Sequence, residues 1–378
     1  MEIKVVENSK SINCDLLVVS MFEGEKTSCE LANKYAVDED KFEGKFGETY
    51  LLPTYGQEVY RKVLVLGLGK KEEFNPNKMR EASAKAIKKA MQIEAKTVAF
   101  SLDGIEFDYS EQFTMGALIA DYSFDKYKSE KKDKKVKEVY VQANEAMVRK
   151  AEKIAAAMSF ARNLANEPAQ FATPTELAAI ACDLGLETKI YDREECEHMG
   201  MGAFLAVAKG SAQEPKFIHM KYSVENPKKR IAIIGKGITF DSGGLDIKPP
   251  SSMLTMKDDM SAAACVLGVM SVIKEFNPQV EVHGIIAACE NMPGCSAYKP
   301  GDILTAKNGK TIEIDNTDAE GRLTLADALC YACELGVDEV VDLATLTGAC
   351  MVALGTAAAG IMGNDDEFVS KLIDTAQR

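Results

Sequence analysis

The sequence predicts an α/β protein of two domains, with mixed or parallel sheets flanked by helices and a long helix joining the domains. Short apolar runs alternate with longer amphipathic stretches along the chain, as strands and helices do in α/β folds. The length of 378 residues suggests about two domains. Hydrophobic residues make up 46% of the chain and charged residues 27%, which are ordinary values for globular proteins.

Individual elements follow from the spacing of apolar residues. Apolar runs of strand length predict buried strands at residues 15–20, 62–66, 97–101, 138–141, 231–234, 282–288 and 339–343. Apolar residues recur at helical spacing at 77–94, 144–163, 175–184, 260–276 and 322–335. Thr173 and Pro174 indicate a helix start, because proline is tolerated in the first turn. Since strands and helices alternate, we expect the sheets to be largely parallel.

The order of elements suggests where the domains divide. A lysine-rich run at 126–137 (KYKSEKKDKKVK) predicts an exposed loop. The long helix that follows has no strand directly after it, so it is suited to joining two domains. We therefore expect an N-terminal α/β domain at residues 1–143, a linker helix region at 144–170 and a second α/β domain at 171–378.

Composition excludes several classes of function. Lys and Arg number 45 against 58 Asp and Glu, which gives a formal net charge of −13 and a pI of about 5.0. Such a chain binds nucleic acid and anionic membranes poorly, although the lysine-rich run leaves nucleic-acid binding open. The ten cysteines and the absence of a secretory signal predict a reduced, cytoplasmic protein.

One uncharged stretch has the length of a membrane span. Residues 343–364 contain no charged side chain. Threonines and glycines interrupt this stretch, however, so we expect a buried, turn-rich core there rather than a transmembrane helix.

Polar side chains concentrate in the middle of the second domain. A glycine-rich run at 235–244 (GKGITFDSGG) follows a predicted strand and would carry Lys236 and Asp241 to the carboxyl end of the sheet, where ligands bind in α/β folds. Its glycine spacing fits neither the P-loop nor the dinucleotide fingerprint. Further on, Asp258 and Asp259 precede a helix of small residues, where they would also complement the helix dipole.

A third polar group lies at residues 316–323 (NTDAEGRL). In an extended chain Asp318, Glu320 and Arg322 would share one face. Neighbouring carboxylates repel each other unless a cation neutralises them. We interpret Asp302, Asp315 and Asp327, which are also nearby in sequence, as solvated or capping groups.

Charge arithmetic points to a pair of metal ions. Asp241, Asp259, Asp318 and Glu320 together carry four negative charges, which two divalent cations would balance. The chain has only three histidines, so a site built from carboxylates suits Mn, Mg or Zn. The residues alone therefore favour a two-metal hydrolase without naming its substrate.

At these residues the chain resembles the leucyl aminopeptidases, cytosolic dinuclear metallo-exopeptidases. Residues 316–323 match the signature octapeptide of that family in full. The stretches 235–244 and 256–260 match two further blocks in the expected order and spacing. Similar segments at 65–71 (VLGLGKK), 116–127 (GALIADYSFDKY) and 343–350 (LATLTGAC) extend the resemblance over nearly the whole chain.

The resemblance implies two bound divalent ions, Mn²⁺ or Zn²⁺. Asp241 and Glu320 would bridge them. Lys236 and Asp259 would complete the tighter site, and Asp318 the more exchangeable one. A lysine can coordinate only as the neutral amine, which two adjacent dications would favour.

The activity implied is release of N-terminal amino acids from peptides by attack of a metal-activated water. The substrate amine would bind one metal ion and Asp259, and Lys248 would polarise the scissile carbonyl. Arg322 would hold a bicarbonate ion that accepts the proton of the water. An apolar pocket suited to Leu and Met is also implied. Its lining would be Met256, Asn316, Thr345, Leu346 and Gly348.

Assembly and partners are implied in the same way. Family members form hexamers, so peptides and further copies of the chain are the expected partners, with no membrane. The N-terminal domain is similar to the macro-like domain of the family.

Two departures from the family pattern stand out. Asp258 lies where the family usually has an uncharged residue. Relatives continue beyond residue 378, so we expect the catalytic domain to lack its C-terminal part, with weakened stability and impaired activity. Two alternatives to an active aminopeptidase therefore stay open: a catalytically impaired, shortened family member, and a DNA-binding regulator of the kind found in this family.

Overall fold

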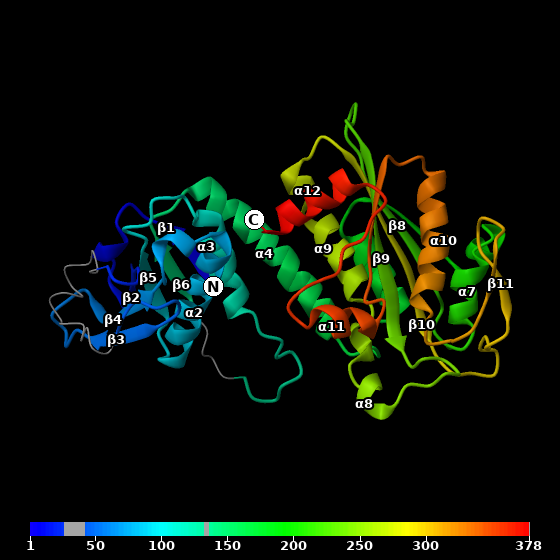
Figure 1. Ribbon diagram of the computed structural model, residues 1–378, viewed down its shortest axis with the longest axis horizontal. Helices are drawn as coiled ribbons and strands as arrows, with labels where there is room; N and C mark the ends of the chain where they lie inside the picture. The colour runs from blue at the N-terminus through cyan, green and yellow to red at the C-terminus, as the bar shows by residue number, and fades with distance from the viewer. Residues whose placement is uncertain (26–41, 132–135, 378) are drawn as a thin grey trace. The chain divides into compact units, whose positions relative to one another are not determined.

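The computed structural model describes residues 1–25, 42–131 and 136–377, which form two compact units (Figure 1). The first unit comprises residues 1–156 together with 361–378, and the second comprises residues 157–360. Helix α4 (Glu145–Asn166) contains the boundary between them. Both units combine a central sheet with helices, so the predicted α/β class with mixed sheets is confirmed. The domain limits expected from the sequence, 143 and 171, stay predictions.

The first unit is built on a six-stranded sheet of order β1-β6-β5-β2-β4-β3. The strands are β1 (Glu2–Val5), β2 (Cys14–Met21), β3 (Thr49–Pro53), β4 (Tyr60–Gly67), β5 (Thr97–Ser101) and β6 (Glu138–Val141). Neighbouring strands are parallel except β3, which runs antiparallel to β4. The remaining elements are η1 (Ser9–Ser11), η2 (Lys71–Glu73), α2 (Pro76–Gln92), α3 (Ser110–Asp121) and α12 (Asp366–Gln377).

Alternating burial along β2 explains why this strand is central. Leu16 and Val18 pack into the core formed with the helices, whereas Leu17 and Val19 pack into a separate cluster on the other face. Both faces are thus apolar, as expected of a parallel strand covered on two sides.

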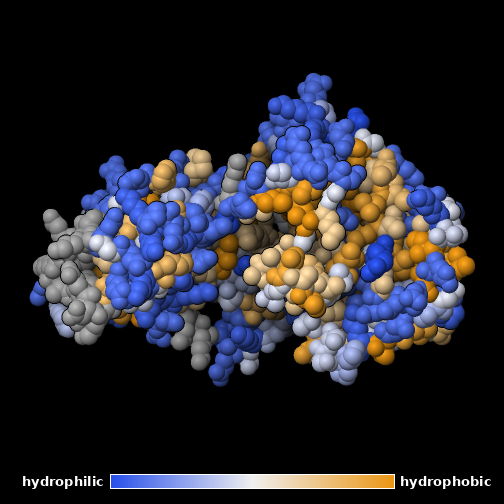
Figure 2. Space-filling model, viewed as in Figure 1, coloured by the Kyte–Doolittle hydropathy of each residue, from blue (hydrophilic) through white to orange (hydrophobic). Residues whose placement is uncertain are grey.

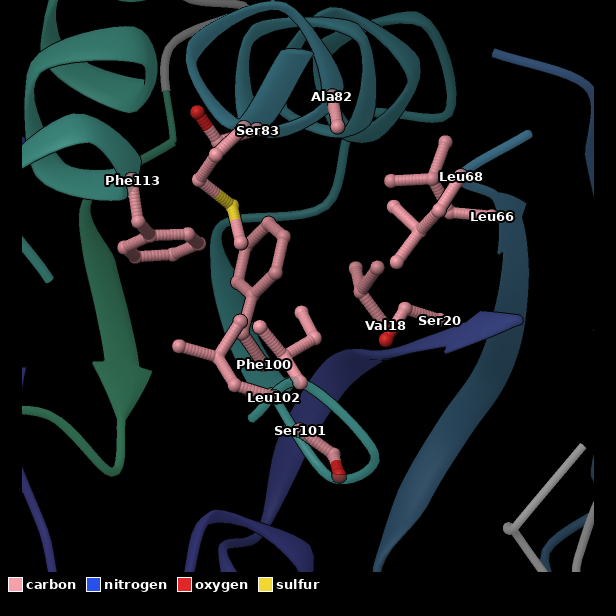
Figure 3. A pocket seen from close by; sticks show the side chains of 12 residues that line it. Val18, Ser20, Leu66, Leu68, Ala82, Ser83, Phe100, Ser101, Leu102 and Phe113 are labelled. Atoms are coloured by element: carbon pink, nitrogen blue, oxygen red, sulfur yellow. The ribbon is translucent and has the colours of Figure 1, made fainter. Parts of the chain in front are cut away.

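A small cavity lies within this unit between the sheet and helices α2 and α3 (Figure 3). Val18, Leu66, Phe100, Ala82 and Phe113 are among its lining residues. Because the lining is largely apolar, we interpret the cavity as a packing feature of the core rather than as a polar site.

The predicted lysine-rich loop is only partly described by the structure. Residues 126–131 are exposed, as expected. Residues 132–135 lie outside the described residues.

The second unit has a five-stranded sheet of order β13-β9-β10-β8-β7 and a hairpin of β11 and β12. The strands are β7 (Glu187–Tyr191), β8 (Lys216–Tyr222), β9 (Arg230–Asp241), β10 (Glu281–Asn291), β11 (Ile303–Thr305), β12 (Thr311–Glu313) and β13 (Glu339–Leu343). β13, β9 and β10 run parallel, while β8 runs antiparallel to β10 and to β7. The expectation of largely parallel sheets therefore holds for the first unit better than for the second.

Helices cover both faces of this second sheet (Figure 1). The helices of this unit are α5 (Pro174–Asp183), α6 (Arg193–His198), α7 (Gly202–Ala208), α8 (Pro250–Met253), η3 (Met256–Asp258), α9 (Ser261–Phe276), α10 (Gly321–Glu334) and α11 (Gly348–Leu354). Side chains of α7 and α10 share one core cluster with Phe217 and Ile285, and those of α5 and α9 share another with Ile218 and Ile286. No helix of the described chain is long and apolar enough to cross a bilayer.

Residues 235–241 of the glycine-rich run are strand rather than the loop that the sequence suggested, and only 242–244 form a turn. β9 continues through it to Asp241, paired with β10 on one side and, up to Gly235, with β13 on the other. A Cβ at Gly235 would lie 2.7 Å from the carbonyl oxygen of Ala262, and a Cβ at Gly237 would lie 2.9 Å from that of Ala287. Glycine is therefore required here because α9 and β10 approach the backbone closely.

The uncharged stretch at 343–364 is exposed, so the expectation of a buried core there is wrong. Met351, Val352 and Met362 are 60%, 89% and 97% exposed, and apolar side chains reach the surface around α11 (Figure 2). The physical reason is position: β13 is an edge strand, and within the described residues no further strand pairs with its outer side.

A buried chain of hydrogen bonds joins the sheet of the second unit to α10. Tyr191 contacts the hydroxyl of Tyr331 at 3.1 Å, and the Tyr331 hydroxyl lies 2.9 Å from Nδ1 of His219. Nε2 of His219 lies 2.8 Å from Nδ1 of His283, whose Nε2 lies 3.1 Å from Glu281 Oε1. With both imidazoles neutral, each group can donate to the next from Tyr191 to Glu281. His283 is 4% exposed, so it is a packed histidine of the core.

This chain predicts a pH-dependent contribution to stability. Burial and the neighbouring His283 lower the pKa of His219 from 6.5 to about 4. The unfolded chain therefore binds a proton first, so stability falls as the pH is lowered from 6.5 to 4, by about 3 kcal/mol in total. In His219→Gln this part of the pH dependence should be absent when urea midpoints are compared across that range. His198→Gln, a change at an exposed histidine, is the control; equal pH dependence in wild type and His219→Gln would contradict the prediction.

Candidate metal and active site

The three carboxylates that the sequence singled out and that lie deepest in the second unit come from three separate places in its fold. Asp241 ends β9, and Asp259 lies between η3 and α9. Glu320 is the N-cap residue of α10. Because β9 and β10 are parallel and their ends pair in register, Asp241 and Asn291 reach the same edge of the sheet.

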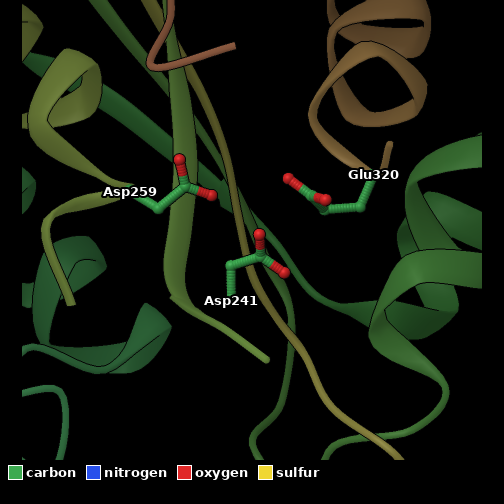
Figure 4. Close-up of side chains that lie close together, drawn as sticks. All are labelled: Asp241, Asp259 and Glu320. Carbon is green, nitrogen blue, oxygen red and sulfur yellow. The ribbon is translucent and has the colours of Figure 1, made fainter. Parts of the chain in front are cut away.

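Three carboxylates meet at this edge. Asp241, Asp259 and Glu320 are 2%, 4% and 2% exposed, and each contributes an oxygen within 4.8 Å of the others (Figure 4). Like charges this close and this buried repel strongly unless cations lie among them. The arrangement has the donor chemistry of a site for a divalent cation.

Two lysines lie among these acids. Nζ of Lys236 is 2.8 Å from both Asp259 Oδ2 and Glu320 Oε1, and the Lys236 side chain is 3% exposed. Nζ of Lys248 is 2.8 Å from Asp241 Oδ2 and also pairs with Asp318. Asp318 thus joins the cluster at its more exposed rim.

The ammonium groups leave part of the negative charge unbalanced. Four carboxylates against two ammonium groups give a net formal charge of −2. Oε2 of Glu320 is buried and accepts no hydrogen bond from any described residue. An orphaned carboxylate oxygen in a buried, negatively charged cluster fits a cation, so the residues present suit a metal.

Burial controls the acidity of these groups. It raises the pKa of Asp259 to about 7, and Glu320 adds to the rise although Lys236 opposes it. Burial also raises the pKa of Glu320, with a further contribution from Asp241. For Lys236 burial favours the neutral amine, but Glu320 and Asp259 outweigh it and raise the pKa. When only carboxylates surround Lys236, its ammonium form is therefore favoured. Bound cations would add positive charge beside Nζ and so favour the neutral amine.

The turn after β9 depends on two glycines. Gly243 and Gly244 have φ of +87° and +67°, a region that side chains disfavour. A Cβ at Gly243 would lie 2.4 Å from the carbonyl oxygen of Asp246. The N–H of Gly243 donates to Asp241 Oδ1 at 2.9 Å, so the turn also holds the carboxylate.

The predicted common face of Asp318, Glu320 and Arg322 is wrong. Glu320 has helical backbone angles, and Arg322 lies in the first turn of α10, where it is exposed. In a helix, residues two apart point in different directions, so the alternation of an extended chain does not apply. Glu320 consequently faces the carboxylates, whereas Arg322 does not join their ion pairs.

Asp327 plays a buried structural role. Its carboxylate accepts hydrogen bonds from the backbone N–H of Phe204 at 2.8 Å and of Lys307 at 2.8 Å. It therefore caps the first turn of α7 and is not solvated, because the residue is completely buried.

Among the predicted substrate-binding residues, Thr345 contacts the cluster. Its hydroxyl donates to Asp259 Oδ1 at 2.7 Å, and its carbonyl accepts from Nζ of Lys236 at 3.1 Å. Leu346 is 42% exposed, Asn316 and Gly348 are exposed, and Met256 is half-buried in η3.

Sequence reasoning missed the residues that hold these loops together. Thr317 donates to the carbonyl of Gly243 at 2.7 Å and, through its backbone N–H, to Asp246 Oδ2 at 2.7 Å. Tyr298 donates to the carbonyl of Thr317 at 2.7 Å. Asn291 donates to Asp241 and to Thr317. Thr317 lies inside the recognised octapeptide, but only distance in space identifies Asn291 and Tyr298.

Comparison with known proteins decides the family. The profile described as "Cytosol aminopeptidase family, catalytic domain" matches residues 159–378, and the profile of the N-terminal domain of the same family matches residues 23–131. The chain belongs to the cytosol aminopeptidase family. It is accordingly a metallo-aminopeptidase, a hydrolase of peptides, and the resemblance to the leucyl aminopeptidases is confirmed.

Relatives and solved structures support this membership. The probable cytosol aminopeptidase of Persephonella marina is 48% identical over 358 residues, which cover 90% of this chain and 72% of that protein. A mutant of tomato leucine aminopeptidase has a TM-score of 0.87 and 34% identity, and the match covers 100% of this chain and 79% of that one. The bottromycin maturation enzyme BotP in complex with Mn has a TM-score of 0.85 and 29% identity, covering 96% of this chain and 79% of that one.

Metal binding should depend on pH because Asp259 holds its proton unusually strongly. With a folded-state pKa of about 7 against 3.8 for an ordinary Asp, the metal-free fold loses stability from this group as the pH rises from 3.8 to 7. Mn²⁺ competes with the proton, so the gain in melting temperature on adding Mn²⁺ should be larger at pH 8 than at pH 6. Thermal unfolding with and without Mn²⁺ at both pH values measures this. The same gain at both would be inconsistent with it.

Proposed function

We propose that the chain is a dinuclear metal-dependent aminopeptidase that releases N-terminal amino acids from peptides, with Leu and Met preferred. The observation that carries this proposal is the convergence of Asp241, Asp259 and Glu320 with Lys236 in a buried, net negative cluster. Family membership makes a peptide the substrate, and the cluster supplies the place where its terminal amine and first carbonyl would bind.

Two divalent ions, Mn²⁺ or Zn²⁺, are the proposed cofactors. Asp241 and Glu320 would contact both ions, Lys236 and Asp259 one, and Asp318 the other. When bound, they would supply Lewis acidity toward the peptide carbonyl and lower the pKa of a water. The solved complex of BotP with Mn supports manganese.

Asp259 is suited to receive the substrate's terminal ammonium. Its Oδ1 is oriented by Thr345 at 2.7 Å, and its Oδ2 faces Lys236 at 2.8 Å. A buried carboxylate held at both oxygens offers a fixed position for a free amine. Requiring that amine would confine cleavage to the first peptide bond.

Lys248 is the proposed group for the carbonyl oxygen. Asp241 and Asp318 hold its ammonium, and both carboxylates outweigh burial and raise its pKa, so it stays charged. A fixed positive charge would stabilise the negative oxygen that develops when water attacks.

Arg322 is the proposed anion site. It lies in the first turn of α10, where the backbone dipoles also leave a positive field. Arg322 would hold a bicarbonate ion there, as the base that takes the proton from the attacking water.

The side chain of the released residue would lie against Met256, Asn316, Thr345, Leu346 and Gly348. The mixture of apolar and small groups favours Leu and Met by only a few kcal/mol over residues of other shapes, so we propose a preference rather than strict selection. We also propose a cytoplasmic location and assembly as a hexamer, following the family resemblance.

The first test is turnover of a leucyl chromogenic amide with added Mn²⁺. Lys248→Gln should lower kcat by about 10²–10³ because one stabilising charge at the carbonyl is lost. Lys209→Gln, a change at an exposed lysine of the same unit, is the matched control. An N-acetylated substrate should not be cleaved. No turnover by a folded, Mn²⁺-loaded wild type would refute the proposal.

The variant Arg322→Gln tests separately whether Arg322 holds the proposed bicarbonate ion. Wild-type kcat should rise with added bicarbonate, because the arginine would concentrate the base beside the water. The variant should lose this dependence while keeping its affinity for Mn²⁺, since Arg322 contacts none of the clustered carboxylates. A variant that still responds to bicarbonate as wild type does would show that the anion binds elsewhere.

A further inference from the structure

Asn291 joins three segments behind the carboxylate cluster. It ends β10, pairs in register with Asp241 at the end of β9, and is completely buried. Its backbone carbonyl accepts hydrogen bonds from the N–H of Ser242 at 3.0 Å and from the Ser242 hydroxyl at 2.8 Å. Its side chain donates a hydrogen bond to the carbonyl of Thr317, which comes directly before Asp318 and Glu320 at the start of α10. One residue thus connects both strand ends and the 316–320 loop.

Both amide hydrogens of Asn291 are used. Nδ2 donates to Asp241 Oδ1 at 2.9 Å and to the carbonyl oxygen of Thr317 at 3.0 Å. A reversed amide would face its oxygen toward two acceptors, so the hydrogen-bond network fixes the orientation. Oδ1 of Asn291 is buried without a hydrogen-bond partner among the described residues. The structure tolerates that orphaned oxygen in order to place the two N–H donors.

These donors determine which carboxylate oxygen of Asp241 is left free to face the proposed cation site. Oδ1 of Asp241 accepts from Asn291 and, at 2.9 Å, from the N–H of Gly243, so it is occupied by neutral donors. Oδ2 of Asp241 faces Lys248 at 2.8 Å. The carboxylate therefore cannot rotate without breaking two buried hydrogen bonds.

The strand geometry supports the same role. The register of β9 and β10 shifts between Cys289 and Glu290, two residues before the strands end. Such bulges re-aim side chains next to active sites. Here the shift brings Asp241 opposite Asn291.

We infer that Asn291 is a positioning residue of the metal centre: it holds Oδ1 of Asp241, so that Oδ2 faces the cation site, and it links this carboxylate to the 316–320 loop through Thr317. This inference rests on the proposed function. Partners that orient a metal ligand in this way commonly affect metal affinity by about 10- to 100-fold.

The test measures Mn²⁺ affinity directly, by calorimetric titration of the full chain and by the electron paramagnetic resonance signal of the Mn²⁺ that remains free. Asn291→Asp has the same shape but places an acceptor against Asp241, and Asn291→Ser removes both donors with a small polar side chain. Each should weaken Mn²⁺ binding by about 10- to 100-fold. Asn308→Asp, the same substitution at an exposed asparagine of the same unit, is the matched control, and there the affinity should change by less than about threefold.

The outcomes separate the two proposals. A wild type that binds no Mn²⁺ would overturn the proposed function. A wild type that binds Mn²⁺ while the folded Asn291 variants bind it equally well would overturn the positioning role alone. If circular dichroism shows that neither variant folds, Asn291 serves folding rather than ligand orientation, and the inference fails.

Discussion

The structure of the second unit depends on one electrostatic constraint: several carboxylates share a buried space at the end of the central strands. Asp241, Asp259 and Glu320 are almost fully buried, and isolated buried charges would be expelled or neutralised. Lys236 and Lys248 supply partial compensation from within the chain. A cluster that is still negative after this compensation is unfavourable for the fold and favourable for a cation, as functional sites often are.

Much of the surrounding architecture serves to hold those acids in place. β9 carries Asp241 to the carboxyl end of the sheet, α10 begins immediately after Glu320, and α9 begins just after Asp259. α10 is itself anchored away from the site, by Asp327 to α7 and by Tyr331 to His219 on β8. Because the helix is fixed along its length, the residue at its N-terminal end has little freedom to move. Site geometry and core packing are thus coupled through one helix.

The sequence predicted the class of the fold and most long elements, since their apolar periodicity is strong. Strands β5, β6 and β13 and helices α2, α5, α9 and α10 agree with the expected ranges within about two residues. Short polar strands such as β8 (KFIHMKY) were missed because lysine and histidine interrupt the apolar run. The glycine-rich end of β9 was misread as a loop because glycine is there for close packing, which only neighbouring strands and helices reveal.

For the site, residue chemistry and family motifs identified the acids and lysines that meet in space. They did not identify Asn291 or Tyr298, because a single polar residue at the end of an apolar strand carries no local signal. They also treated 316–323 as extended, although the apolar spacing predicted a helix from residue 322; in the structure Glu320 already has helical backbone angles.

The open side of β13 has a consequence for how the protein behaves in solution. Among the residues that the structure describes, no strand pairs with the outer side of β13, and an unpaired edge beside exposed apolar side chains invites strand-to-strand association between molecules. Asp342 on that strand and the net charge of −13 oppose such contacts by mutual repulsion, whereas Glu339 is paired with Lys229. Because repulsion between surface charges weakens as ionic strength rises, concentrated salt removes the barrier that keeps these edges apart, and low ionic strength preserves it.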